Sequence, residues 1–140
     1  MPGFNTIEDV IEDLQNGRMV VLVDERDTDI DGQEAVGEGE LMMLAELATA
    51  DSINFMMRRA GNPPMFTASK EHLEALELHQ TTPSAQGPRG ASIMVSVNAR
   101  DIENTGVSAQ DRALTIRKLS DPASTPERSE EHTSELQSPA

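Results

Sequence analysis

Apolar residues recur at helical spacing in four separate segments of the chain. In the first segment these positions are Ile7, Val10, Ile11 and Leu14. They follow the i, i+3, i+4, i+7 pattern of one helical face. Thr6 precedes them with Asp9 three residues on, which is typical of a capping box, and Gly17 is placed to end the helix. The pattern therefore predicts a capped amphipathic helix near the N-terminus.

Three further helices are predicted downstream, each preceded by a residue that can cap it. The predicted caps are Thr49 or Asp51, then Ser69, then Ser108. The apolar positions behind them are Ile53, Met56 and Met57 in the second helix, Leu73, Leu76 and Leu78 in the third, and Ala113, Leu114, Ile116 and Leu119 in the fourth. The second helix ends at Arg58-Arg59, where the helix dipole favours cations, and the fourth stops before Asp121-Pro122.

Three short apolar runs are predicted strands. Residues 19–23 form a continuous apolar run, which indicates a strand buried on both faces. Residues 65–68 and 93–97 are the other two candidates, and residues 81–90, rich in Pro and Gly, are predicted to be a loop. Strands and helices mostly alternate, which favours an α/β-like arrangement.

Composition restricts the possible functions. The chain has 140 residues, enough for one domain, and its three Phe with no Trp or Tyr indicate an aliphatic core helped by eight Met. The net charge of −14 argues against nucleic acid and against anionic membrane surfaces as partners. There is no Cys, no pattern of a signal peptide and no apolar run of membrane-spanning length. We therefore expect a cytoplasmic protein.

An acidic, glycine-containing segment follows the first predicted strand. Its eight carboxylates are Asp24, Glu25, Asp27, Asp29, Asp31, Glu34, Glu38 and Glu40. The run from Asp27 through Asp29 and Asp31-Gly32 to Glu38 matches the spacing of a twelve-residue calcium loop. Glu34 at a usually apolar place, and a strand before the loop, speak against that interpretation. A solvated acidic surface is the alternative.

Two groups of residues resemble a known family. Residues 105–112, read as Thr-Gly-Val-Ser-Ala-Gln-Asp-Arg and followed by Thr115-Ile116-Arg117, resemble a signature of 3,4-dihydroxy-2-butanone 4-phosphate synthase. Residues 38–42, 45–46, 49 and 53–56 are similar to the same family, as is the segment 90–100. The resemblance runs from about residue 7 to residue 127.

The resemblance implies an α+β fold with a central mixed sheet covered by helices, and a homodimer with active sites at the subunit interface. It implies conversion of ribulose 5-phosphate, a phosphorylated sugar, to the four-carbon precursor of riboflavin plus formate. The implied cofactor is Mg²⁺ or Mn²⁺. The resemblance implies Glu38 and Glu40 for catalysis, Arg26, Glu40, Thr105 and Ser108 for substrate, and Asp27 and Glu38 for metal. The spacing of the calcium-type loop adds Asp29 and Asp31 as metal candidates, with Ca²⁺ as the ion.

The acidic segment departs from the family pattern. The family's loop reads Asp-Arg-Glu-Asn-Glu-Gly-Asp, whereas only Glu38-Gly39-Glu40 matches its end here. The roles of its Arg and metal-binding Glu could pass to Arg26 and Asp27 across an insertion. Counting back from Glu38 instead places Ala35 and Val36 at those positions, which would remove both functions.

The end of the chain is the second departure. The family continues to an Arg-x-Gly-His-Thr motif whose His is a metal ligand, and the sequence around His132 lacks its glycine. Residues 128–138 resemble the translation of a sequencing-library adapter. We therefore expect residues 1–127 to be the N-terminal, truncated part of the domain, residues 128–140 to be a disordered artefactual tail, and the chain to be inactive as it stands. The alternatives are a non-catalytic relative that has lost the metal site, and a small module binding a divalent cation through residues 27–38.

Overall fold

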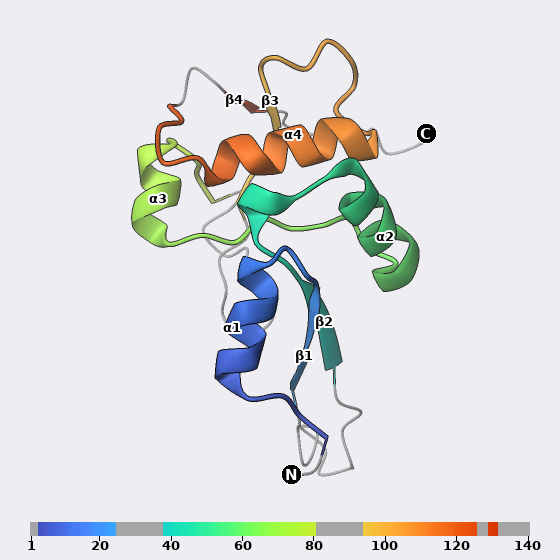
Figure 1. Cartoon of the computed structure of the whole chain (residues 1–140). Helices are drawn as coiled ribbons and strands as arrows, with labels where there is room; N and C mark the ends of the chain where they lie inside the picture. Colours follow the sequence, from blue (N-terminus) through green and yellow to red (C-terminus); the bar gives the residue numbers. More distant parts are fainter. Residues whose placement is uncertain (1–2, 25–37, 81–93, 126–128, 132–140) are drawn as a thin grey trace, which may run out of the picture.

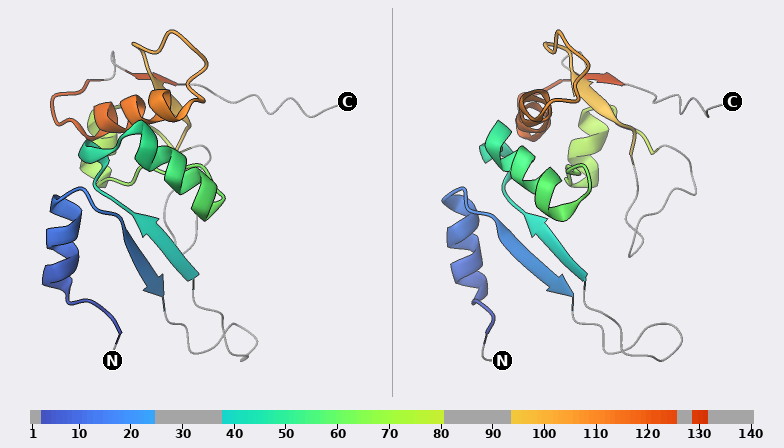
Figure 2. Two further views of the ribbon diagram at one scale, coloured as in Figure 1. Left: turned by 45° about the vertical axis from the view of Figure 1, so that its right-hand side comes forward. Right: turned by 90° about the vertical axis from the view of Figure 1, so that its right-hand side faces the viewer.

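The computed structural model describes residues 3–24, 38–80, 94–125 and 129–131. Its elements, in chain order, are α1 (Ile7–Gln15), β1 (Val20–Asp24), β2 (Glu38–Met42), a short 3₁₀ helix η1 (Ala45–Leu47), α2 (Ala50–Ala60), α3 (Lys70–Ala75), β3 (Val97–Ala99), α4 (Ala109–Ser120) and β4 (Ser129–Glu131). Figures 1 and 2 show β1 and β2 extending away from α2, α3 and α4, with α1 beside β1. The predicted α+β class is confirmed.

The four predicted helices are present, and local hydrogen bonds explain their starts. Thr6 Oγ1 accepts from the Asp9 amide at 3.2 Å, and Asp9 Oδ2 accepts from the Thr6 amide at 3.3 Å. Thr49 forms a similar reciprocal pair with Ser52. The hydroxyls of Ser69 and Ser108 cap α3 and α4 in the same way. Side chains that satisfy the first free amides of a helix fix its N-terminus from local sequence alone.

The third helix is shorter than predicted. It ends at Ala75, because Glu77 adopts a left-handed conformation with φ of 55° and the Leu78 amide turns back to donate to the Leu73 carbonyl at 3.0 Å. This closing turn places Leu76 and Leu78 in the core although they lie beyond the helix. The apolar spacing predicted their burial correctly and the end of the helix incorrectly.

β1 and β2 pair antiparallel, with Val20 opposite Met42 and Asp24 opposite Glu38. Residues 38–40 are therefore strand, where the sequence indicated a loop. The prediction that the first strand is buried on both faces is wrong, since Val21, Leu22 and Val23 are 63%, 52% and 44% exposed. Among the described residues β1 has one strand partner, so its faces are not enclosed as they would be inside a larger sheet.

The described strands form two separate antiparallel pairs, β1–β2 and β3–β4, in place of the single mixed sheet expected. β3 begins at Val97, near the end of the predicted strand 93–97, while Met94 makes an isolated bridge to Gln80. Residues 65–68 are not a strand, although Phe66 packs on the core. The predicted loop at 81–90 lies outside the described residues.

The C-terminal part of the chain contributes one short strand. The backbone of β4 pairs with β3, with Val97 opposite Glu131 and Ala99 opposite Ser129. This pairing differs from the disorder expected for residues 128–140. The edge of a strand offers free amides and carbonyls with which an extended segment can pair. Residue 128 and residues 132–140 lie outside the described part, so the division at residue 127 stays a prediction.

The core of the described residues consists of two small clusters, and α4 contributes a residue to each. One cluster joins α2 to α4 and contains Ala48, Ile53, Met56 and Ala113. The other joins α3 to the end of α4 and contains Leu76, Leu78 and Leu119. By contrast, α1 has no buried residue, and Ile7 and Ile11 are 65% and 48% exposed. The two buried clusters of the described structure therefore lie among the helices that follow β2.

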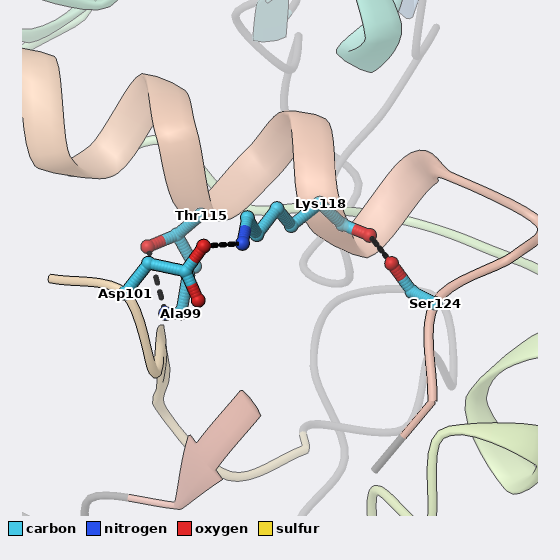
Figure 3. A network of polar contacts seen from close by, with 5 residues as sticks. All are labelled: Ala99, Asp101, Thr115, Lys118 and Ser124. Carbon is cyan, nitrogen blue, oxygen red and sulfur yellow. Dashed lines mark hydrogen bonds and ion pairs between the residues drawn. The ribbon is translucent and has the colours of Figure 1, made fainter. Parts of the chain in front are cut away.

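Polar contacts to the backbone hold α4 in place. Arg117 donates to the Ala48 carbonyl at 2.6 Å, and His72 Nε2 lies 2.6 Å from the Leu119 carbonyl. The buried Thr115 hydroxyl accepts from the Ala99 amide at 3.2 Å and donates to the Asp111 carbonyl at 3.0 Å. Figure 3 shows Thr115 beside the Lys118–Asp101 ion pair. α4 is thus connected to α3, to β3 and to the start of α2.

No helix in the described residues is long and apolar enough to cross a membrane.

Candidate functional site

The residues that precede α4 form a tight turn, here called the 105–108 turn. Thr105 and Ser108 are exposed, whereas Gly106 between them is buried. Ser108 Oγ accepts from the Asp111 amide at 3.1 Å and so caps α4. Arg112 Nε donates to the Val107 carbonyl at 2.8 Å, which ties the turn to the first part of α4. The turn therefore presents two hydroxyl residues at the positive end of a helix dipole.

Gly106 is required by the shape of this turn. Its φ of +74° lies in the left-handed region that side chains with a Cβ rarely adopt. A Cβ built on Gly106 would also overlap the side-chain amide of Asn98, which packs directly against this residue. Asn98 Nδ2 in turn donates to the Thr105 carbonyl at 3.3 Å. Asn98, on β3, therefore contacts two adjacent residues of the turn.

The two candidate catalytic carboxylates lie on β2. Glu40 stands opposite Leu22 in the ladder with β1, and its side chain is exposed. The backbone of Glu38 pairs with Asp24 at the end of the same ladder, and its side chain lies outside the described part. Gly39 lies between them, and a Cβ there would stand 3.4 Å from Val21 Cγ1, close to ordinary van der Waals contact. β2 thus presents Glu40 to solvent on a paired strand.

α2 contacts both β2 and α4, so this helix connects the two groups of candidate residues. Of the four predicted substrate residues, the structure describes Glu40, Thr105 and Ser108, and all three are exposed. Arg26 and the metal candidates Asp27, Asp29 and Asp31 lie outside the described residues. The calcium-type loop at 27–38 therefore has no structural test here.

Within the described ranges, no group of three or more His, Asp or Glu side chains is arranged to hold a metal ion. Glu40 is the candidate carboxylate whose side chain the structure places. An exposed carboxylate of this kind suits Mg²⁺, which keeps several waters and takes only one or two carboxylates together with substrate oxygens. Glu40 could thus supply one ligand, and the side chains of the other metal candidates lie outside the described part.

Sequence reasoning missed two residues that bond to the turn from neighbouring elements. Arg112 belongs to the segment 105–112 that carries the family resemblance, but its bond to Val107 was not predicted. Asn98 was not singled out at all, because it precedes the turn by several residues in a strand whose position was predicted two to four residues early. An Asn in an otherwise apolar strand, followed closely by a Gly in a Thr-Gly pair, was the available signal.

These features define an α+β protein in which a glycine turn before a capped helix and a carboxylate on an antiparallel strand are the candidate functional groups. The family model for 3,4-dihydroxy-2-butanone 4-phosphate synthase matches residues 8–137, and the chain belongs to this family.

Relatives and solved structures agree with this assignment. The chain is 38% identical over 125 residues to the riboflavin biosynthesis protein RibBA of Aquifex aeolicus, covering 88% of this chain and 29% of that protein. It is 37% identical over 125 residues to the 3,4-dihydroxy-2-butanone 4-phosphate synthase of Pseudomonas syringae pv. tomato, covering 89% of this chain and 32% of that protein. The chain thus spans about a third of the length of these curated relatives.

A solved 3,4-dihydroxy-2-butanone 4-phosphate synthase in complex with two magnesium ions matches with a TM-score of 0.70 and 31% identity, over 91% of this chain and 56% of that one. The synthase of Candida albicans matches with a TM-score of 0.69 and 28% identity, over 91% of this chain and 59% of that one. The α+β class predicted from the resemblance is therefore shared with solved members of the family.

Proposed function

We propose that this chain provides part of a 3,4-dihydroxy-2-butanone 4-phosphate synthase, a lyase that converts ribulose 5-phosphate to 3,4-dihydroxy-2-butanone 4-phosphate plus formate. The observation that carries the proposal is the 105–108 turn. Gly106, Ser108 and Arg112 belong to the family-like segment, and each has a definite structural role in shaping the turn. A chain that shared only the packing of its helices with the family would not need a left-handed Gly106 or the hydrogen bonds of Ser108 and Arg112.

Each candidate residue has a role in this chemistry. The reaction begins with proton abstraction next to a ketose carbonyl, for which Glu38 or Glu40 is the proposed base. The hydroxyls of Thr105 and Ser108 are proposed to donate to the substrate phosphate, close to the free amides at the start of α4. Arg26 is proposed as a further substrate contact.

A divalent cation is proposed as the cofactor. Asp27, Asp29, Asp31 and Glu38 are the proposed ligands, with Mg²⁺ as the first choice and Mn²⁺ as its substitute. When bound, the ion would stabilise the negative charge that develops on the sugar oxygens. It would also offset the repulsion between a chain of net charge −14 and a phosphorylated substrate.

The test is binding of ribulose 5-phosphate to the 140-residue chain, followed by NMR through the backbone amides, with and without Mg²⁺. We expect saturable shifts at Ser108 and at Glu40, and weaker shifts with inorganic phosphate alone, which lacks the sugar. Absence of saturable shifts at millimolar ribulose 5-phosphate would contradict the proposed function.

We also propose that this chain does not release formate by itself, because no Arg-x-Gly-His-Thr motif occurs in its sequence. Formate above background, lost in Glu40→Gln, would show that the 140 residues suffice and that His132 must be reconsidered.

A second candidate is a non-catalytic relative, favoured by Ala35 and Val36 where the family has Arg and Glu when the acidic segment is aligned from Glu38. It predicts binding of the phosphate group without any effect of Mg²⁺. A homodimer and a cytoplasmic location stay proposals. Sedimentation analysis tests the first and imaging of the tagged full-length gene product the second.

A further inference from the structure

The Asn98 side chain reaches the 105–108 turn from outside that turn and α4. It lies in the middle of β3, between Val97 and Ala99. A carbonyl can only accept a hydrogen bond, so the Asn98 amide nitrogen, 3.3 Å from the Thr105 carbonyl, is the donor. Arg112, the other side chain that bonds to the turn's backbone, belongs to α4 and moves with that helix. Asn98 therefore links the turn to a different element.

The same side chain limits the conformation of Gly106. All three terminal atoms of the Asn98 amide occupy the space that a Cβ on Gly106 would need. Gly106 is buried because Asn98 covers it, although its neighbours Thr105 and Val107 are exposed. Asn98 thus fixes the turn by a hydrogen bond at Thr105 and by packing at Gly106.

The next residue of β3 connects to α4 as well. The Ala99 amide donates to the buried Thr115 hydroxyl at 3.2 Å, two turns along the helix from Ser108. Asn98 and Ala99 are consecutive residues of β3. The first is hydrogen-bonded to the turn before α4, and the second to Thr115 within α4. This double attachment sets where Thr105 and Ser108 stand relative to the rest of the fold.

We propose that Asn98 is a positioning residue of the substrate site: it holds the 105–108 turn so that the exposed side chains of Thr105 and Ser108 converge on the phosphate group of a sugar phosphate. The substrate part of this inference rests on the proposed function, whereas the control of the turn by Asn98 does not. Asn98 itself is half-buried beneath the turn and is assigned no contact with substrate.

The test compares Asn98→Ala and Asn98→Asp with Asn16→Ala in the full 140-residue chain. Asn98→Asp keeps the shape but cannot donate to the Thr105 carbonyl. Asn16 is a matched control, since its Nδ2 also donates to a backbone carbonyl, that of Glu12 at 2.9 Å, at the end of α1. The readouts are the amide shifts of residues 105–108, the exchange rate of the Asp111 amide, the melting temperature and the dissociation constant for ribulose 5-phosphate.

We expect both Asn98 variants to shift the turn amides, to speed exchange at Asp111 and to weaken ribulose 5-phosphate binding roughly tenfold. Asn16→Ala should change the melting temperature little, since α1 has no buried residue, and should leave binding unchanged. Turn amides that do not move in either Asn98 variant would overturn the inference. So would equal loss of binding in Asn16→Ala, because the effect would then be general destabilisation. If the unchanged chain does not bind ribulose 5-phosphate, the proposed function fails, and the amide shifts and Asp111 exchange still decide whether Asn98 controls the turn.

Discussion

Gly61→Ala and Gly106→Ala should differ strongly in stability although both glycines have nearly the same backbone conformation. Their φ values are +77° and +74°. Gly61 ends α2 with nothing within 4 Å of the position that a Cβ would occupy, whereas the corresponding position at Gly106 overlaps Asn98. The pair therefore separates the cost of left-handed backbone from the cost of a steric conflict.

The magnitude follows from these two terms. An alanine in the left-handed region costs about 1 kcal/mol relative to glycine, so Gly61→Ala should lower the free energy of unfolding by about that amount. Overfilling a packed site adds about 1–3 kcal/mol. Asn98 could relieve the overlap by rotating away, but it would then lose its bond to Thr105, which is worth about 1 kcal/mol. Gly106→Ala should thus cost about 2–4 kcal/mol in total.

The assay is urea unfolding of four proteins: the unchanged chain, Gly106→Ala, Asn98→Ala and the double variant. Removing the Asn98 side chain makes room for a methyl group, so Gly106→Ala in the Asn98→Ala background should cost only the backbone term. The coupling energy of this cycle is expected to be at least about 1 kcal/mol. For a chain of this size each kcal/mol corresponds to about 3–4 °C in melting temperature.

Equal costs for Gly61→Ala and Gly106→Ala, together with a coupling energy near zero, would refute the reasoning. Such a result would mean that Asn98 does not pack on Gly106 in solution. A large cost at Gly61 would instead show that the backbone term alone had been underestimated.

Three other features are tested by separate changes. Thr115→Val keeps the shape but leaves the buried Ala99 amide without its acceptor, so it should cost about 1–3 kcal/mol in urea unfolding, while Thr115→Ser, which keeps the hydroxyl, should cost less. Saturable calcium binding lost in the Asp29→Asn, Asp31→Asn double variant would identify a calcium loop, whereas magnesium binding lost in Asp27→Asn would favour the family's metal role. No response of the amides to either ion at millimolar concentration would leave the segment as acidic surface. Deleting residues 128–140 should leave the melting temperature unchanged, and a clear drop would show that the β3–β4 pairing stabilises the fold.

Local patterns predicted the helices well because their determinants are close in sequence. The caps at Thr6, Ser69 and Ser108 each act through an amide three residues away. The periodic apolar positions of α2 and α4 also identified Ile53 and Ala113 as core residues. These are interactions that a single segment specifies for itself.

Features that depend on distant residues were not predictable in this way. Residues 38–40 of β2 were predicted as loop because Glu38-Gly39-Glu40 has little strand propensity, and their conformation follows from pairing with β1. His72 Nε2 lies 2.6 Å from a carbonyl 47 residues away, a contact that no local pattern indicates. The role of Asn98 depends on the fold bringing β3 under the turn. The sequence could therefore identify the exposed polar residues of the candidate site, but it could not show the contacts that hold them in position.

The isolation of α1 has a consequence for how the protein opens. Because no residue of this helix is buried, its order depends mainly on its own capping box and on limited contact with β1. Short helices of this kind are marginal without tertiary packing. The amides of α1 should therefore exchange with solvent through a local opening of low free energy, while those of α2 and α4 exchange only when the core between them separates. The residues packed between α2, α3 and α4 would then form one small cooperative unit, and α1 would melt and re-form independently of it.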